Sequence, residues 1–189
     1  MNICVYGAAS EAIDKEYIHQ GEALGKLIAR RGHKLVYGAG ALGMMGAVSR
    51  GVESENGYVL GVVPEFFTNE EILNMNCSEL IRTKSMRERK QIMEDNSDAF
   101  IVTPGGIGTF EEFLEILTLK QLARHNKPIV LFNIMGFYDS MIAMLDEAIK
   151  GNFINVECKE MYPAYSSAEE VIDYIENYVK MDLSHMKNK

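Results

Sequence analysis

The chain has 189 residues, 47% of them apolar and 24% charged, and a formal net charge of −8 at pH 7. This composition is typical of a globular domain that buries a core without disulfides or a structural metal. The acidic balance argues against a protein that binds duplex nucleic acid or an anionic membrane surface, because both partners require a basic face.

The sequence gives no sign of a membrane span or a metal centre. It has no apolar run of about 18 residues, so no transmembrane helix is expected. Its N-terminus lacks the basic region of a signal peptide. Three widely spaced cysteines and four isolated histidines form neither a disulfide framework nor a metal-ligand pattern. We therefore expect a cytoplasmic protein without a metal.

Short apolar runs that end near glycine or proline alternate with segments of helical spacing. The runs predict buried parallel strands, and the segments between them predict amphipathic helices. The expected strands are residues 2–6, 34–37, 58–63, 99–103 and 128–132, and the expected helices are residues 11–31, 42–53, 85–96, 109–124, 137–150 and 167–180. Residues 65–82 are polar and irregular, and no element is predicted there.

This alternation predicts a single Rossmann-like α/β domain over residues 1–182, followed by a frayed polar tail at residues 183–189. The fold would be a doubly wound parallel sheet in three α/β/α layers. Such folds bind ligands beyond the carboxyl ends of the strands, near the point where the strand order reverses. The residues that carry the chemistry should therefore lie in the loops that follow the strands.

Three glycine-bearing loops follow predicted strands. The first is Gly7–Ser10, and the second, Gly38–Gly43, fits the pattern G-x-G-x-x-G. That pattern follows the second strand rather than the first and lacks the expected downstream acidic residue, so classical NAD binding is disfavoured. The third loop, Pro104–Thr109, has three glycines between a strand and a helix N-terminus, which favours a phosphate site. It is not a Walker A loop, because no Lys-Ser/Thr pair follows Gly108.

The charged residues near this loop have two interpretations. Thr109 and Glu112 have the spacing of a capping box, which would make both structural. Alternatively, Glu112 faces a ribose and stabilises positive charge on the sugar or activates water. Likewise, Arg87, Arg89 and Lys90 form either a solvated helix face or a cationic group that faces a phosphate.

Several segments together resemble one known family. Residues Pro104–Glu112 match the PGGxGTxxE motif of the Lonely Guy family, and Met86–Lys90 resembles its MHERK-like stretch. Val36–Gly46 resembles the family's VYGGGxxGLMG segment. Arg89 and Glu112 lie 23 residues apart, as expected for this family. The similarity extends over nearly the whole chain.

The resemblance implies a cytoplasmic homodimer that acts on a nucleoside 5′-monophosphate without a cofactor. Family members are phosphoribohydrolases that cleave the N-glycosidic bond of cytokinin riboside 5′-monophosphates, which releases an N6-substituted adenine and ribose 5-phosphate. By resemblance, Arg89 and Glu112 form the catalytic pair. The implied phosphate and nucleotide contacts are Gly105, Gly106, Gly108, Thr109, Ser10, Gly40, Lys90, Glu71 and Thr118.

Departures from the family pattern leave the base preference open. Arg87 stands at a usual histidine, Ala39 at a usual glycine and Ala41 at a usual small polar residue, and Ala8-Ala9 replaces a more polar loop. One alternative is a general AMP or 5′-nucleotide nucleosidase, which shares the chemistry but has a different base pocket. Another is a non-catalytic carrier of a nucleotide or of molybdenum cofactor, which would not need an arginine–glutamate pair. The family label lysine decarboxylase has no support, because no lysine has the context of a pyridoxal Schiff-base site.

Overall fold

The computed structural model describes residues 1–184, apart from the side chain of Glu70, and they form a domain around a parallel sheet of seven strands. The strands are β1 (Asn2–Tyr6), β2 (Lys34–Tyr37), β3 (Val59–Pro64), β4 (Glu79–Thr83), β5 (Ala99–Val102), β6 (Ile129–Phe132) and β7 (Ala164–Tyr165). The α-helices are α1 (Lys15–Arg30), α2 (Gly43–Ser54), α3 (Met86–Asp95), α4 (Ile107–Gln121), α5 (Asp139–Lys150) and α6 (Ala168–Glu176), and short 3₁₀ segments are η1 (Glu70–Ile72), η2 (Ile134–Gly136) and η3 (Val156–Met161).

The strand order is β4-β3-β2-β1-β5-β6-β7, so the chain reverses its direction across the sheet between β1 and β5. These two strands pair in parallel, with Tyr6 opposite Val102 at their carboxyl ends. The loops after β1 and β5 therefore leave the sheet side by side and diverge to opposite faces. This divergence makes the switch point at which open α/β sheets bind ligands.

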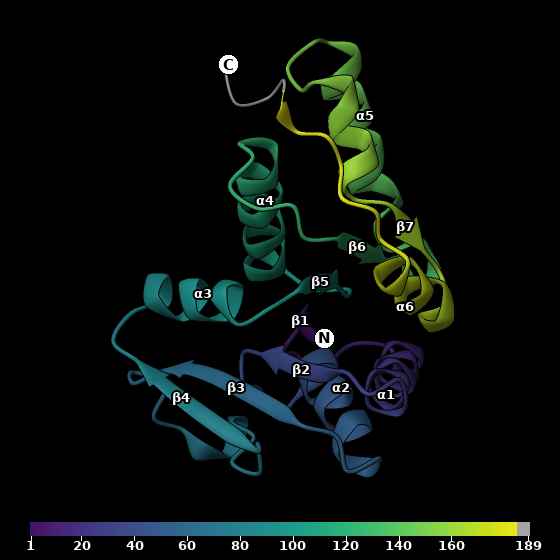
Figure 1. Cartoon of the computed structure of the whole chain (residues 1–189). Coiled ribbons are helices and arrows are strands. Elements are labelled where there is room, and N and C mark those ends of the chain that lie inside the picture. Colours follow the sequence, from purple (N-terminus) through teal and green to yellow (C-terminus); the bar gives the residue numbers. More distant parts are fainter. Residues whose placement is uncertain (185–189) are drawn as a thin grey trace.

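Each central strand supplies side chains to two cores because successive residues point to opposite faces of a sheet. Cys4 and Tyr6 of β1 join a core that includes residues of α3, α4, α5 and η3. Ile3 and Val5 of the same strand join a core with residues of α1, α2 and α6. Figure 1 shows α3, α4 and α5 on one side of the sheet and α1, α2 and α6 on the other. The predicted three-layer α/β/α fold is confirmed.

All the predicted strands are present, with ends within one residue of the predicted ones, but the two edge strands were not predicted. β4 lies in the irregular segment 65–82 and carries polar residues such as Glu79 and Arg82. β7 has only two residues. Neither edge strand is buried on both faces, so neither has the continuous apolar run that predicted the inner strands.

The prediction of a polar frayed tail from residue 183 is wrong at its first position. Leu183 is buried and packs in the core with α4 and α5 residues. Residues 185–189 of this predicted tail lie outside the described residues. The ordered C-terminal segment therefore extends past α6 and back to the face that carries α4.

Candidate active site

A cavity of about 440 Å³ lies at the carboxyl ends of the strands near the switch point. The three glycine-bearing loops contribute to its wall, together with residues of α2, α3, α4 and the segment after β3. Its lining residues are Gly7, Ala8, Ala9, Gly38, Gly40, Leu42, Met45, Val63, Pro64, Phe67, Ile72, Leu73, Met86, Arg89, Gly106, Gly108, Thr109 and Glu112. Arg89 and Glu112 are the only ionisable side chains among these described lining residues.

Backbone hydrogen bonds join the three glycine-bearing loops into one wall. The N–H of Ala8 donates to the Pro104 carbonyl at 3.1 Å, and the N–H of Met45 donates to the Ala8 carbonyl at 3.1 Å. Gly43 has a φ of +59°, and a side chain there would bring its Cβ within 2.6 Å of the Ala8 carbonyl oxygen. Glycine at position 43 therefore permits both the left-handed turn and the close approach of the first two loops.

The segment between β3 and β4 closes another side of the cavity. The Ala41 N–H donates to the Ile72 carbonyl at 2.9 Å, and the Asn74 N–H donates to the Ala39 carbonyl at 2.8 Å. These bonds place the side chains of Ile72 and Leu73 in the cavity wall. The irregular stretch without a predicted element is thus attached to the second glycine-bearing loop.

The predicted capping box at Thr109 and Glu112 is wrong. Helix α4 begins two residues earlier, with Gly106 as the N-cap, and no side chain caps it. Thr109 is the third residue of the helix and packs beneath Gly105, where an added Cβ would lie 2.1 Å from the threonine Oγ1. Glu112 lies in the second turn, so helix capping does not explain its position.

The first turn of α4 leaves backbone N–H groups available for an anion. The first backbone bond of this helix is donated by the Phe110 N–H to the Gly106 carbonyl, so the preceding N–H groups have no partner within the helix. No heavy atom lies within 4 Å of an ideal Cβ at Gly106 or Gly108, so the space in front of these residues is open. An uncapped helix N-terminus with an open approach is suited to a phosphate group.

Arg89 and Glu112 form a buried ion pair on one wall of the cavity. Arg89 Nη1 lies 2.8 Å from Glu112 Oε1, and Arg89 Nε donates to the Val62 carbonyl at 3.1 Å. An ideal Cβ at Gly38 would lie only 1.9 Å from Arg89 Nη2, so the guanidinium reaches the carboxylate by passing directly over this glycine. The absence of a side chain at Gly38 therefore leaves room for the ion pair.

Burial and pairing act in opposite directions on the Glu112 carboxyl group. Burial raises its pKa, and the adjacent Arg89 guanidinium opposes that rise, with a net pKa above the ordinary value of 4.5. A carboxylate that is raised in energy by burial but kept close to a fixed cation is suited to interact with positive charge that develops on a substrate.

The structure brings only some of the predicted nucleotide contacts to the cavity. Gly40, Gly106, Gly108 and Thr109 line it, whereas Gly105 lies next to the lining on top of Thr109. Ser10 is exposed at the end of the first loop and accepts a hydrogen bond from the Ala12 N–H.

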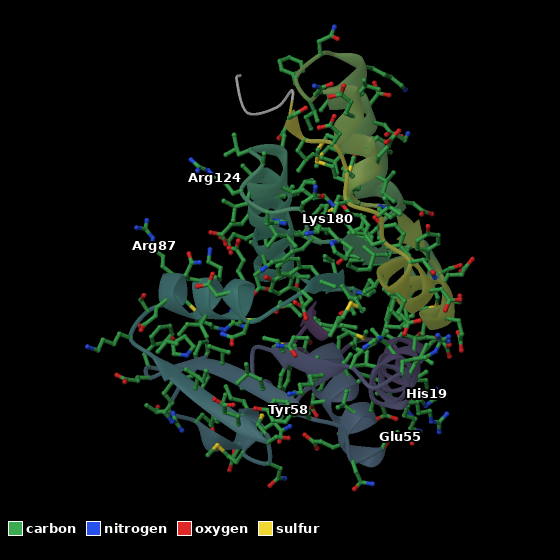
Figure 2. The ribbon with its side chains drawn as sticks, viewed as in Figure 1. His19, Glu55, Tyr58, Arg87, Arg124 and Lys180 are labelled. Atoms are coloured by element: carbon green, nitrogen blue, oxygen red, sulfur yellow. The ribbon has the colours of Figure 1, made fainter. Side chains whose placement is uncertain are left out.

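Three further predicted contacts lie away from the cavity lining. Glu71 is exposed in η1, although its neighbour Ile72 reaches the cavity. Lys90 pairs with Glu111 and Glu115 on the outer side of α4. Thr118 lines a separate hollow on that side of the helix. Arg87, at the family's usual histidine position, is exposed and projects outward from α3 (Figure 2).

Sequence reasoning missed the apolar part of the cavity wall. Leu42, Met45, Phe67, Ile72, Leu73 and Met86 come from loops and helix starts, where no periodic pattern marks a side chain as facing a ligand. Among the described residues, no group of three or more His, Cys, Asp or Glu side chains could hold a metal ion. Within the same range, no helix is long and apolar enough to cross a membrane.

Solved structures with the same architecture include two proteins linked to molybdenum cofactor. The molybdenum cofactor binding protein of Rippkaea orientalis is 23% identical, with a TM-score of 0.66 and coverage of 93% of both chains. The molybdenum cofactor carrier protein of Chlamydomonas reinhardtii is 22% identical, with a TM-score of 0.67 and coverage of 93% of this chain and 96% of that one. At this level of identity, the likeness establishes the fold.

Curated relatives are more similar in sequence. The probable cytokinin riboside 5′-monophosphate phosphoribohydrolase LOGL5 of Oryza sativa subsp. japonica is 38% identical over 94% of this chain and 72% of its own length. The cytokinin riboside 5′-monophosphate phosphoribohydrolase LOG2 of Arabidopsis thaliana is 36% identical over 94% of this chain and 83% of its own. A family model described as "Possible lysine decarboxylase" matches residues 45–175. By the extent of these matches, the chain belongs to the Lonely Guy family, the family of the cytokinin riboside 5′-monophosphate phosphoribohydrolases.

Proposed function

We propose that this protein is a phosphoribohydrolase that cleaves the N-glycosidic bond of an N6-substituted adenosine 5′-monophosphate, which gives the free base and ribose 5-phosphate. The observation that carries this proposal is the buried Arg89–Glu112 pair, which shares one cavity with the uncapped N-terminus of α4. A carrier needs a phosphate site but has no use for a buried carboxylate next to it. The names of the curated relatives support the same activity.

In this proposal, the 5′-phosphate binds at the first turn of α4. The N–H groups before Phe110 and the open approach at Gly106 and Gly108 supply the anion site. Gly105 and Thr109 shape the same turn. Anchoring the phosphate there restrains the ribose, so binding energy from a non-reacting group orients the anomeric carbon.

Glu112 acts on the sugar. It lies one turn, or about 5 Å, further along α4 than the phosphate-binding N–H groups, which is a suitable offset for the ribose that follows the phosphate. Its carboxylate stabilises positive charge on the ribose or positions the attacking water. Water adds to the anomeric carbon, the bonding electron pair leaves with the base, and a proton released by the water balances the one taken up by the base.

Arg89 holds the Glu112 carboxylate in place and favours its ionised form through the 2.8 Å contact. An arginine is a poor proton donor because its pKa is so high, so we assign it orientation and charge stabilisation rather than acid catalysis. Every step uses groups of the chain, the substrate and water, so the proposal requires no cofactor.

The apolar wall of the cavity favours an alkylated adenine over plain AMP. Met45, Phe67, Ile72 and Met86 present carbon and sulfur surface in the same cavity as the proposed catalytic pair. Burial of an apolar N6 substituent in such a site would stabilise the complex by about 0.8 kcal/mol per methylene group. AMP lacks this substituent, so it would gain less from the apolar wall.

We also propose a homodimer formed by the outer face of α4, in a cytoplasmic protein whose three cysteines are unpaired. Ile107, Leu114 and Leu122 are exposed there, with Ile107 83% exposed, and a hollow next to them includes Thr118. Large apolar side chains on one helix face are typical of a protein interface. Contacts of Lys90 and Thr118 with a nucleotide, as predicted from the family, would then be made across the dimer. Leu114→Glu should shift the protein to monomer in sedimentation equilibrium, and an unchanged mass would reject this interface.

The activity is tested by incubating the purified protein with N6-isopentenyl-AMP, AMP, CMP and N6-isopentenyladenosine, and by following the free base by chromatography. We expect base release from the isopentenyl monophosphate, less from AMP and none from the dephosphorylated riboside. Faster release from AMP or CMP would instead support the general nucleosidase. Tight nucleotide binding without any base release would support the non-catalytic carrier.

A further inference from the structure

The connection from β6 to α5 turns back over the carboxyl end of β5 and places Tyr138 there. Met135 and Gly136 have φ angles of +52° and +73°, which reverse the chain direction within a few residues. The Asn133 side chain accepts a hydrogen bond from the Tyr138 N–H at 2.7 Å and donates to Asp139 at 2.8 Å. A non-glycine residue at positive φ costs free energy, so the surrounding contacts must hold this turn in place.

Tyr138 contacts the phosphate-binding segment on both sides of its glycines. The Tyr138 hydroxyl donates to the Thr103 carbonyl at 2.7 Å, directly before Pro104. Its ring meets Phe110, in the first turns of α4, edge-on with the ring centroids 6.5 Å apart. Tyr138 itself is fully buried and does not line the cavity. One buried side chain therefore touches the residue before the glycines and the helix that follows them.

Thr103 also contacts the first glycine-bearing loop and the end of β1. Its N–H and its hydroxyl both donate to the Tyr6 carbonyl, at 2.9 and 2.8 Å. An ideal Cβ at Gly7 would lie 2.3 Å from Thr103 Oγ1, so the first loop packs closely against this residue. The position of the Thr103 carbonyl thus affects both loops at the switch point.

We propose that Tyr138 is a positioning residue for the 5′-phosphate, an inference that rests on the proposed phosphate site. Its hydroxyl fixes the Thr103 carbonyl, and this fixes the path from Pro104 to the first turn of α4. The backbone N–H groups are then held in the orientation that binds the anion before the substrate arrives. No described residue beyond Glu112 lines the cavity, so Tyr138 acts on substrate binding through the Thr103 carbonyl and Phe110 rather than by direct contact.

Tyr162 offers a matched control. It is buried, its ring packs edge-on against Phe113 of α4 at 5.8 Å, and its hydroxyl has no hydrogen-bond partner among the described residues. Tyr138→Phe and Tyr162→Phe each remove one buried hydroxyl near the same helix. Only the first removes a hydrogen bond to the phosphate-binding segment.

The experiment measures binding of AMP and adenosine by calorimetry for the unmodified protein and both variants, together with KM and kcat where base is released. Because Tyr138→Phe removes one hydrogen bond, we expect AMP binding to weaken about fivefold and KM to rise in parallel. Adenosine binding and kcat should change less than about twofold. Tyr162→Phe should leave all these values unchanged. Asn133→Ala, which loosens Tyr138 without altering it, should weaken AMP binding in the same direction even if Tyr138→Phe folds poorly.

Equal losses for AMP and adenosine in Tyr138→Phe would overturn the inference, because a general structural role would weaken both. Unchanged AMP binding would overturn it as well. If the unmodified protein binds AMP but releases no base, the proposed function fails, and the selective loss of AMP affinity still decides the role of Tyr138.

Discussion

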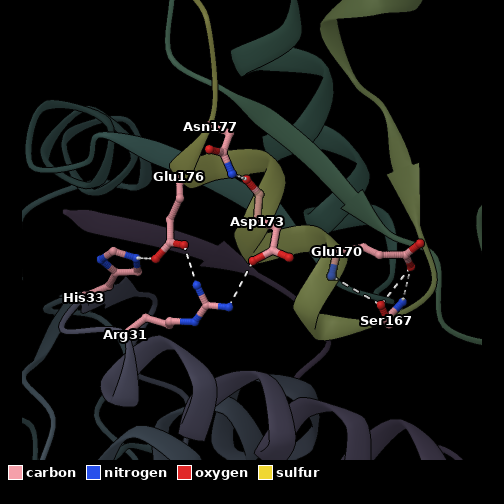
Figure 3. Close-up of polar contacts among 7 residues, drawn as sticks. All are labelled: Arg31, His33, Ser167, Glu170, Asp173, Glu176 and Asn177. Carbon is pink, nitrogen blue, oxygen red and sulfur yellow. Dashed lines mark hydrogen bonds and ion pairs between the residues drawn. The ribbon is translucent and has the colours of Figure 1, made fainter.

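Two guanidinium–carboxylate clusters in this molecule use the same chemical groups in opposite surroundings. In the cavity, Arg89 and Glu112 have side chains that are 9% and 11% exposed. At the junction of α1 and α6, the Arg31 side chain is 40% exposed and binds Glu176 at 2.7 Å and Asp173 at 3.0 Å (Figure 3). The exposed arginine has two carboxylate partners at distances similar to the 2.8 Å of the buried pair, yet it lies on the surface.

The difference shows why distance alone does not identify a functional ion pair. Exposed pairs contribute little to stability because water and salt screen them. Both charged groups of a buried pair lose their hydration, so the pair is costly to retain. It is best explained by a function that requires a dehydrated charge. Figure 3 also shows the capping box of α6, formed by Ser167 and Glu170, where a carboxylate has a purely local structural role.

Glu112→Gln should produce the largest effect, because it removes the charge of the buried cluster while keeping the side-chain shape. Base release should fall by about 10²–10⁴-fold, the range associated with loss of a charged catalytic group. Glu115→Gln is the control, since Glu115 is an exposed partner of Lys90 on the same helix. Single-turnover rates measure both. Activity retained in Glu112→Gln would make the buried pair structural.

Gly38→Ala should disturb the same pair through the backbone. The new Cβ would lie 1.9 Å from Arg89 Nη2, so the guanidinium must move away from Glu112. We expect a loss of about 1–3 kcal/mol in the free energy of unfolding and a clear loss of activity. Denaturant unfolding and initial rates measure the two effects. Full activity in this variant would show that the observed pair geometry is not needed.

The decrease of kcat/KM at low pH should reflect the raised pKa of the buried Glu112 carboxyl group. Its pKa is raised above 4.5 by burial, and catalysis requires the ionised carboxylate, so kcat/KM should fall as the pH decreases through a value above 4.5. A pH profile of kcat/KM with N6-isopentenyl-AMP tests this. A second profile with a phosphonate analogue of the substrate distinguishes the titration of the substrate phosphate from that of Glu112. An acid limb at or below 4.5 would contradict a raised pKa.

Arg31→Ala should have the smallest effect. It removes both ion pairs of the exposed cluster, and we expect a loss of at most about 1 kcal/mol in the free energy of unfolding and unchanged base release. Thermal unfolding at low and high salt measures the change, which should shrink as salt increases. A loss much above 1 kcal/mol would show that the clusters differ less than their exposure indicates.

The sequence was sufficient for the parts of the fold and site that depend on local pattern. Inner strands have continuous apolar runs, so their limits were predicted within one residue. Arg89 and Glu112 occupy positions set by motifs that begin α3 and α4, and the structure brings these two side chains together.

The parts that failed depend on contacts between distant segments. The capping prediction for Thr109 failed because α4 starts at Ile107, where a glycine N-cap leaves the threonine free to pack under Gly105. In and next to α4, Leu114 and Leu122 are exposed, whereas Lys120 is fully buried. A helix with apolar residues on two faces does not reveal from its own sequence which face is covered.

The hydrogen bonds among the glycine-bearing loops limit how this site could be altered by exchanging segments with a relative. The Ala8 N–H donates a hydrogen bond to the Pro104 carbonyl, and the Ala8 carbonyl accepts one from the Met45 N–H. A chimera that imports only one of the three loops would bring a backbone path shaped for different neighbours. A transplant of substrate preference should therefore move the three loops as a single block, even though about 95 residues separate the first from the last.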